Sequence, residues 1–269
     1  MFKHCLNMEI VRSVGKWGNS AGVLLPREWM GNQVKVVLIE RTLDIKKEVM
    51  EILEPYLEDI IGIYLTGSYA RGEQGEYSDI DVIAISRSAS KEIKSGKYSI
   101  SIVKLEGVRK SIIKNPILIL PRLLEAKTII NDSLLAELKS IEIKKSYFKE
   151  FIEECERIIR INKKLIELDK DEGEELKSLG VIYSLILRLR GIFIANLILK
   201  RKKYYKMDFL NYIYKEIGKD EGEEAYRIYT NIRDDKKVKE SVKIETAEKL
   251  LSSLQKGVRK LKDEKKKEA

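Results

Sequence analysis

The sequence contains few of the residue types on which many functional sites depend. Its 269 residues include two cysteines, Cys5 and Cys155, and a single histidine, His4. Two cysteines exclude a disulfide framework and a cysteine-rich zinc site. One histidine near the start excludes histidine catalysis and histidine-ligated metals for nearly all of the chain.

Long apolar runs are missing as well. No uninterrupted run approaches the roughly 18 residues that a transmembrane helix requires. The first residues are polar, and the apolar segment of a signal peptide does not follow them. We therefore expect a cytoplasmic protein with no membrane span.

Charge, by contrast, is abundant and unbalanced. Charged residues make up 35% of the chain and the net charge is +9, which favours a polyanionic partner or substrate. Residues 236–269 contain twelve Lys and Arg against six Asp and Glu, and so supply most of the excess. This segment either contacts nucleic acid or forms a solvated helix end with a tail, and the sequence leaves both open.

The first block of the chain, residues 8–40, consists of short β-rich segments. Strands are predicted at 8–14, 22–26 and 33–40, with the Gly and Asn of turns between them. A unit of this size cannot bury a core alone. It needs the rest of the protein or a second chain, which predicts a homodimer.

The next two blocks differ in their periodicity. Residues 43–145 alternate between helical and strand patterns. The predicted elements are a helix at 43–60 that Pro55 kinks or ends, strands at 61–66, 80–85 and 98–105, and helices near 69–74, 107–115 and 117–127. Residues 146–262 are almost wholly helical, and the nearly all-apolar segment 178–204 is typical of the central helix of a bundle.

These blocks predict a multidomain α+β protein. We expect a small β unit at 1–41, a mixed-sheet α/β domain at 42–145 and a helical bundle with a basic tail at 146–269.

The chemistry is concentrated in the stretch IYLTGSYARGEQGEYSDIDVIAIS, residues 63–86. A strand, then Gly67 and Ser68, then the start of a helix form a phosphate cradle. Gly67 lets backbone approach a ligand closely, Ser68 offers a hydroxyl, and the first N–H groups of the helix are unpaired donors.

Two acids follow at the head of the next strand. Asp79 and Asp81 are two residues apart and therefore point to the same face of a strand. Like charges so placed repel each other unless a cation lies between them. Carboxylates together with substrate phosphates suit Mg²⁺.

This stretch resembles the nucleotidyltransferases of the DNA polymerase β superfamily, in particular the minimal and antibiotic-type members. The matching motifs are Leu-Thr-Gly-Ser at 65–68, Arg-Gly at 71–72, Ser78, and Asp-Ile-Asp-Val at 79–82. The resemblance implies that Gly67, Ser68 and Arg71 bind a nucleoside triphosphate, ATP in our expectation. It further implies that Asp79 and Asp81 hold Mg²⁺ for transfer of a nucleoside monophosphate to a hydroxyl.

One departure from the family pattern concerns a third carboxylate, which the superfamily normally places on a later strand. The strand here is YSISIVKL, with Ser99 and Ser101 where an acid is expected. The nearest substitutes are Glu106 and Glu125, each of which also fits an ordinary surface or salt-bridge residue. Without a third acid we expect weak transfer, or nucleotide binding alone.

The N-terminal block resembles a different family, the AbrB/MazE-type swapped-hairpin DNA-binding domains, through VGKWGNSAGVLLPREWMGNQVKVVLIE at 14–40. In that family two chains interleave their hairpins. The resemblance implies a dimer and DNA contacts from Arg12, Lys16 and Asn19. The family often has basic residues where this chain has Gly15 and Leu24, so a module for dimerisation alone stays open.

Two hypotheses follow. The first is a Mg²⁺-dependent nucleotidyltransferase that modifies a protein or RNA and carries an N-terminal dimerisation and DNA-binding module. The second is an antitoxin-like DNA-binding regulator whose nucleotidyltransferase domain modifies or only binds a separate toxin protein. RNA as the acceptor depends on the basic tail alone.

Overall fold

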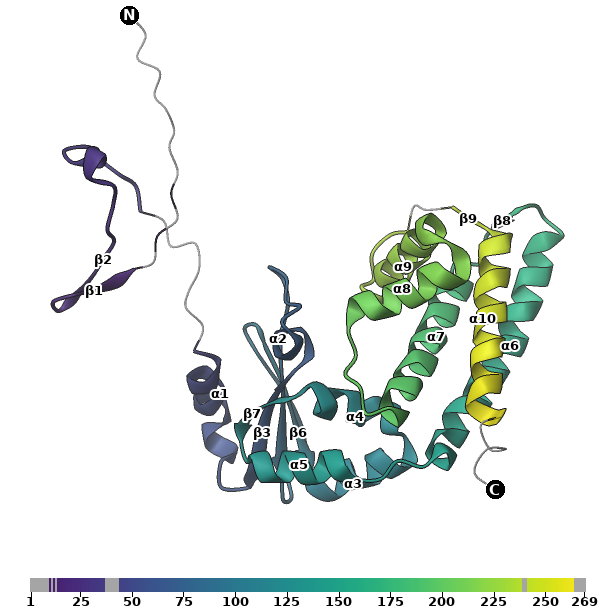
Figure 1. The fold of residues 1–269 in the computed structure, drawn as a ribbon, viewed down its shortest axis with the longest axis horizontal. Helices are drawn as coiled ribbons and strands as arrows, with labels where there is room; N and C mark the ends of the chain where they lie inside the picture. The colour runs from purple at the N-terminus through teal and green to yellow at the C-terminus, as the bar shows by residue number, and fades with distance from the viewer. Residues whose placement is uncertain (1–9, 11, 13, 37–43, 239–240, 264–269) are drawn as a thin grey trace, which may run out of the picture. The chain divides into compact units, whose positions relative to one another are not determined.

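The structure is a computed structural model that describes residues 10, 12, 14–36, 44–238 and 241–263. The chain divides into two compact units, residues 1–44 and residues 45–269 (Figure 1).

The first unit contains the predicted turn. Strand β1 (Gly15–Trp17) pairs with β2 (Ser20–Gly22) in an antiparallel hairpin, and Gly18 adopts a left-handed φ of +57° in the turn between them. A short 3-10 helix, η1 (Arg27–Trp29), follows.

Two of the strands predicted in this unit are not formed where the structure describes them. Residues 23–26 and 32–36 have no strand pairing, while 37–40 and most of 8–14 lie outside the described residues. A strand is stable only beside a partner strand. The described part of this unit offers these segments no partner strand. The prediction of strands there was wrong because it was made from residue composition alone.

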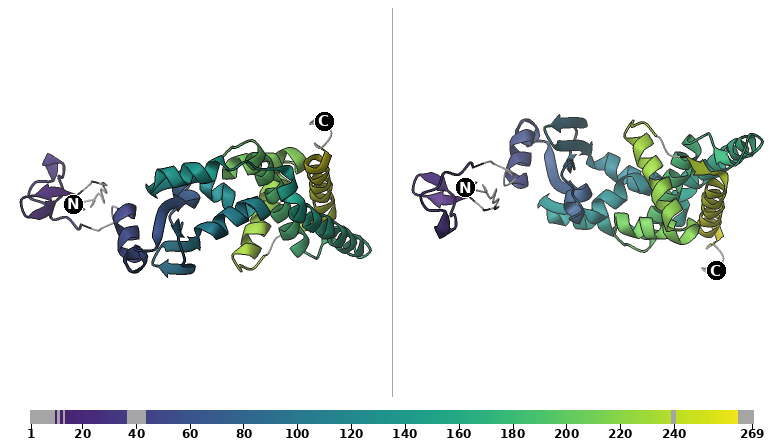
Figure 2. Two further views of the ribbon diagram at one scale, coloured as in Figure 1. Left: turned by 90° about the horizontal axis from the view of Figure 1, so that it is seen from below. Right: turned by 90° about the horizontal axis from the view of Figure 1, so that it is seen from above.

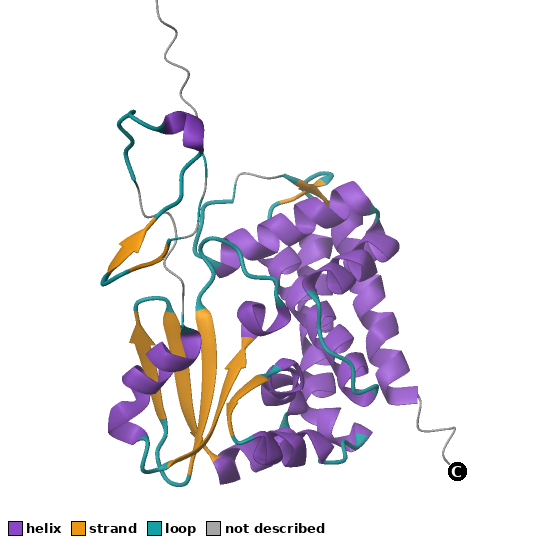
Figure 3. Cartoon of the chain, turned by 60° about the vertical axis from the view of Figure 1, so that its left-hand side comes forward, coloured by secondary structure: helices purple, strands orange, loops and turns teal. Residues whose placement is uncertain are grey.

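A mixed five-stranded sheet forms the centre of the first half of the second unit (Figure 3). In spatial order it consists of β5 (Lys91–Ser95), β6 (Tyr98–Lys104), β4 (Ile80–Ser86), β3 (Ile60–Thr66) and β7 (Lys127–Ile130). Strands β4 and β6 are parallel and the other neighbours are antiparallel. The three predicted strands are therefore confirmed, whereas β5 and β7 were missed.

Helices cover this sheet and connect its strands. They are α1 (Ile45–Leu53), α2 (Gly67–Arg71), α3 (Leu105–Lys114), α4 (Pro116–Glu125) and α5 (Asp132–Ser140). Helix α1 ends where a 3-10 turn carrying Pro55 begins, because proline lacks the N–H that a helix interior needs. The predicted helix near 69–74 begins earlier, at Gly67, and α5 was not predicted.

The second half of this unit is helical, as predicted. It consists of α6 (Lys149–Lys170), α7 (Gly180–Leu199), α8 (Lys206–Ile217), α9 (Lys219–Arg233) and α10 (Ile244–Asp263). A two-residue pairing of β8 (Glu175–Leu176) with β9 (Val242–Lys243) joins the ends of the bundle. Figure 2 shows these helices gathered at the end of the unit that carries the C-terminus.

Helix α7 is the central helix of the bundle. It packs against α10, α9, α4 and α6, and half of its residues are buried. By length and composition it is also apolar enough to cross a membrane, but 56% of its most apolar window is buried inside the protein. Its apolar surface is therefore explained by its place in the core.

The sheet and the bundle share one hydrophobic core. Buried residues of the strand β4, such as Ile83 and Ile85, belong to the same cluster as Leu120 of α4 and Leu185 of α7. Residues 45–269 form one compact unit. The domain boundary predicted at 145/146 stays a prediction.

Candidate functional site

The turn from β3 to α2 brings backbone against a carboxylate. Gly67 has a left-handed φ of +71°. A Cβ at this position would lie 2.2 Å from Oδ2 of Asp81, far inside any real contact. The predicted phosphate cradle and the Asp-x-Asp motif are therefore in direct contact, and only glycine fits between them.

Asp81 lies at the start of the central strand β4. It pairs in register with Thr66 on one side and with Ser99 on the other. Burial raises the pKa of Asp81; the positive charge of Arg122 opposes this, and the negative charge of Asp79 adds to it. Asp79 and Asp81 are thus close enough to repel each other, a repulsion that a bound cation relieves.

Glu125, at the C-terminal end of α4, binds the turn between β3 and α2. Its Oε1 accepts the N–H of Gly67 at 2.7 Å and its Oε2 accepts from Nη1 of Arg71 at 2.7 Å. The side chain is buried, with the residue only 4% exposed, and burial raises its pKa against the lowering effect of Arg71. Each oxygen accepts a hydrogen bond from the cradle or its helix, so Glu125 positions the cradle. Its use as the third carboxylate stays a prediction.

The other proposed substitute for the third carboxylate, Glu106, is excluded by its place in the fold. Ser99 is the residue beside Asp81, and Lys104, five positions further along the strand, lies roughly 17 Å from Ser99. Glu106 lies beyond that end and is exposed. The register therefore puts a serine where the third acid was expected.

Arg71 is held from three sides. Its Nε donates to Glu73 at 2.7 Å, its Nη1 donates to Glu125, and its guanidinium lies 5.7 Å from the ring centre of Tyr204. These partners fix the orientation of α2. The predicted contact of Arg71 with a nucleotide stays a prediction.

Ser78 shapes the loop that leads to the acids. Its hydroxyl accepts the N–H of Gly75 at 2.9 Å. This bond closes the turn immediately before Asp79. The motif serine therefore has a local structural role.

The helical half contributes cations and tyrosines next to α2. Arg190 lies 5.0 Å from the ring centre of Tyr204, and Lys206 lies 5.4 Å from that of Tyr226. Burial raises the pKa of Tyr226 to about 12, so its hydroxyl stays protonated at neutral pH. These residues add positive charge and aromatic surface next to the predicted triphosphate site.

Sequence reasoning missed these residues, and it also missed Arg122. The positive charge of Arg122 lowers the pKa of Asp81 more than that of Arg71 does. A signal existed: Arg122 and Glu125 are the only charged residues of α4, three apart on an otherwise apolar helix. For Tyr204 the sequence offers only its place in the run KRKKYYK.

Comparison with protein families gives a clear match. A model of the nucleotidyltransferase domain family matches residues 45–265. The chain belongs to this family. The match covers the whole described part of the second unit and none of the first unit.

Known proteins similar to this nucleotidyltransferase include a candidate protein adenylyltransferase from Methanocaldococcus jannaschii. The two are 31% identical over 148 residues, which make up 51% of this chain and 99% of that relative.

Two solved structures are similar. One is a nucleotidyltransferase-like protein from Exiguobacterium sibiricum 255-15, with 12% identity and a TM-score of 0.38 over 80% of this chain and 75% of that chain. The other is a spectinomycin adenyltransferase, AAD(9), from Enterococcus faecialis, solved with ATP and spectinomycin. It has 16% identity and a TM-score of 0.41 over 81% of this chain and 98% of that chain.

The donor set of this nucleotidyltransferase fits a magnesium ion that is completed by its substrate. No group of three His, Cys, Asp or Glu comes together within the described residues. Asp79 and Asp81 provide two carboxylates, and the negative charge of Asp79 contributes to the raised pKa of Asp81. Mg²⁺ is commonly held by one or two carboxylates together with substrate phosphates and water, so two acids suffice.

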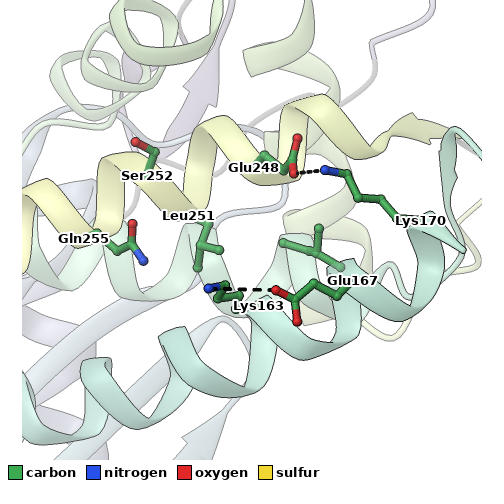
Figure 4. Close-up of a pocket in the computed structure, with 8 residues that line it drawn as sticks. Lys163, Glu167, Lys170, Glu248, Leu251, Ser252 and Gln255 are labelled. Atoms are coloured by element: carbon green, nitrogen blue, oxygen red, sulfur yellow. Dashed lines mark hydrogen bonds and ion pairs between the residues drawn. The ribbon is translucent and has the colours of Figure 1, made fainter.

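A groove of about 300 Å³ between α6 and α10 is a separate feature (Figure 4). Its lining residues come from these two helices and none from β3, α2 or β4. Its charges are already paired, Lys170 with Glu248 at 2.5 Å and Lys163 with Glu167 at 3.8 Å. It does not contribute to the nucleotidyltransferase site.

The predicted DNA-contacting residues lie in the first unit. Lys16 is in β1, Asn19 in the hairpin turn, and Arg12 just before the hairpin, and all three are exposed. Their role in DNA binding and the resemblance to AbrB/MazE-type domains both stay predictions.

Proposed function

We propose that the protein transfers AMP from ATP to a hydroxyl group of another protein, with Mg²⁺ held by Asp79 and Asp81. The observation that carries the proposal is the contact between Gly67 and Asp81, which joins the phosphate cradle to the acidic pair. The protein acceptor is supported by the similarity to a candidate protein adenylyltransferase.

In the proposed reaction the acceptor oxygen attacks the α-phosphorus, the bond to the β-phosphate oxygen breaks, and pyrophosphate leaves. The N–H groups and hydroxyl at Ser68 bind phosphate oxygens. Bound Mg²⁺ would neutralise developing charge on the phosphates. Glu125 keeps the turn in place through Gly67, and Arg71 and Arg122 add positive charge.

The acceptor hydroxyl must lose its proton during transfer. Ser99, which pairs with Asp81, stands where a carboxylate could have received that proton. A general base typically contributes about 10²–10⁴-fold. We therefore propose a slow reaction, or one in which the acceptor itself brings the base.

The test incubates the protein with cell extract and ATP labelled at either the α or the γ phosphate. Transfer of AMP incorporates label from the α position only, and Asp81→Asn removes it. Label from γ alone means kinase chemistry and contradicts the proposal. Treatment of the labelled product with protease or ribonuclease separates a protein acceptor from an RNA acceptor.

A second candidate function is DNA binding by a dimer, as in an antitoxin-like regulator whose partner is a toxin protein. It is favoured by the exposed apolar residues of the first unit together with exposed Arg12, Lys16 and Asn19. A mobility shift with the DNA upstream of its own gene tests it, with Arg12→Ala and Lys16→Ala as variants. Equal shifts for wild type and double variant would contradict specific contacts from these residues.

A further inference from the structure

The connection between α7 and α8 concentrates positive charge beside the nucleotidyltransferase site. We name residues 200–206, Lys-Arg-Lys-Lys-Tyr-Tyr-Lys, the basic strap. It contains five cations and no acid. In Figure 1 it rises along the side of α7 that is turned toward α2.

One end of the strap is anchored by its arginine. Arg201 donates from Nη1 to the carbonyl of Lys139 and from Nη2 to the carbonyl of Ile141, both at 2.5 Å. These carbonyls lie at the C-terminal end of α5, where unpaired carbonyls favour a cation. Arg201 also holds a left-handed φ of 55°. Its charge is therefore used inside the structure.

The other end of the strap reaches the site. The N–H of Lys206 donates to Oε1 of Glu73 at 3.1 Å, and Glu73 in turn binds Arg71. Tyr204 is 6% exposed and packs between Arg71 and Arg190. Lys203 directly precedes Tyr204, so its backbone lies within about 4 Å of that residue along the chain.

The remaining lysines of the strap point to solvent. Lys200, Lys202 and Lys203 are exposed, and no ion pair of theirs occurs within the described residues. Lys203 also lies near Lys139, whose pKa is lowered by burial and then by the charge of Lys203, against a smaller effect of Asp132. The Arg201 anchor thus holds the positive charges of Lys203 and Lys139 near each other. Binding of an anionic partner would reduce the repulsion between them.

We propose that Lys200, Lys202 and Lys203 bind an acidic segment of the acceptor protein and so direct its hydroxyl to the site beside Asp81. This inference rests on the proposed transfer to a protein. An RNA acceptor is disfavoured because single-stranded RNA binding uses successive exposed rings. Tyr204 is buried, which leaves Tyr205 as the strap's single ring for stacking.

The experiment measures binding of two labelled probes by fluorescence anisotropy: a peptide of one tyrosine followed by six glutamates, and a twelve-residue oligouridine. The test variant is Lys200→Glu, Lys202→Glu, Lys203→Glu, with the milder Gln triple as a second version. The matched control is Lys110→Glu, Lys114→Glu, Lys164→Glu, which reverses three exposed lysines on α3 and α6.

We expect the acidic peptide to bind the wild type. Its affinity should fall at least tenfold in the strap variant and should also fall with rising salt. Its affinity for the control variant should stay within twofold of that for the wild type. Stabilisation by ATP and Mg²⁺ in a melting experiment is expected to be unchanged in the strap variant.

Tighter binding of the oligouridine than of the peptide would overturn the inference, as would no binding of either probe. Loss of ATP stabilisation in the strap variant would overturn it too, since the lysines would then serve the triphosphate. Peptide binding without any AMP incorporation in the labelled-ATP assay supports the inference about the strap and instead contradicts the proposed function.

Discussion

The two units of the chain treat their apolar residues in opposite ways. In residues 45–269 the strands and helices bury a continuous core, with Ile83, Leu120 and Leu185 fully enclosed. In the first unit, Trp17 is 67%, Leu24 72% and Met30 80% exposed.

Large exposed apolar residues gathered in one small unit mark an interaction surface. The comparison indicates that the second unit buries a core of its own, while the first unit leaves large apolar side chains exposed and needs another surface to cover them. We propose that this surface belongs to a second copy of the protein. The catalytic site and the surface for assembly are then separate parts of one polypeptide.

A large loss of transfer is expected at a turn glycine of the second unit, Gly67, and none at a turn glycine of the first unit, Gly18. Gly67→Ala places a Cβ on the Asp81 carboxylate, so AMP transfer should fall at least about a hundredfold. Gly18→Ala, in the hairpin of the first unit, has the same backbone strain but nothing within 4 Å. It should leave transfer unchanged, as measured with α-labelled ATP.

A control within the second unit removes the remaining ambiguity. Gly72 has a φ of +74°, close to that of Gly67, and a Cβ there meets nothing within 4 Å. Gly72→Ala should cost roughly 1–2 kcal/mol of stability from strain and retain transfer. Equal losses for Gly67→Ala and Gly72→Ala would mean that strain, and not the contact with Asp81, explains the effect.

The next prediction concerns stability and tests the buried hydrogen bonds of Glu125 in the second unit. Glu125→Ala removes the partner of Nη1 of Arg71 and of the N–H of Gly67 inside the protein, which should lower the free energy of unfolding by about 3 kcal/mol. For a unit of this size that corresponds to a fall in Tm of roughly 6–12 °C.

The matched control is Glu137→Ala, which breaks a half-exposed pair with Arg109. An exposed pair contributes less than about 1 kcal/mol, so its Tm should change little. Equal shifts for the two variants would contradict the positioning role of Glu125.

Removal of residues 1–44 tests whether the first unit is responsible for dimer formation. We expect the full chain to be a dimer and the chain of residues 45–269 to be a monomer, because the exposed apolar residues gathered in the small first unit, such as Trp17 and Met30, are removed with it. Light scattering measures the mass. A monomeric full chain, or a shortened chain that remains dimeric, would place the interface elsewhere.

The smallest expected effect is a pH dependence at Asp81. Burial raises the pKa of Asp81 in the folded protein, so its ionised form destabilises the fold at pH values above that raised pKa. Asp81→Asn should therefore raise the Tm slightly at pH 7, and the gain should vanish below the ordinary aspartate pKa of about 3.9. Melting curves between pH 3 and 7 measure it, and a gain that is independent of pH would show that the charge of Asp81 is not the cause.

Activity should follow the same group in the opposite sense. In the proposed reaction, transfer needs the ionised carboxylate as a metal ligand. The rate should therefore fall at acid pH, where Asp81 becomes protonated.

Much of the second unit was predictable from sequence because its signals are local. The Gly-Ser turn and the Asp-x-Asp motif lie within one strand–helix–strand segment, and β3, β4 and β6 follow the predicted strands closely. The long apolar pattern of α7 likewise showed its central place in the bundle.

What sequence reasoning missed depends on contacts between distant segments. Glu125 is 58 residues from Gly67 and Tyr204 is more than a hundred residues from Arg71, so no spacing rule joins them. The edge strands β5 and β7 are short and partly exposed, which weakens their hydrophobic pattern. The predicted strands of the first unit failed because strand propensity alone does not provide a partner.

The most direct test of this account is AMP transfer by residues 45–269 alone, as wild type and as Asp81→Asn, compared with the full chain in the same extract. We predict that the shortened wild type incorporates α-label at a rate within about threefold of the full chain, and that Asp81→Asn reduces the rate about a thousandfold, the effect of losing several kcal/mol of charge stabilisation. A shortened chain that keeps its fold but loses transfer would contradict the claim that the second unit is the complete catalytic part.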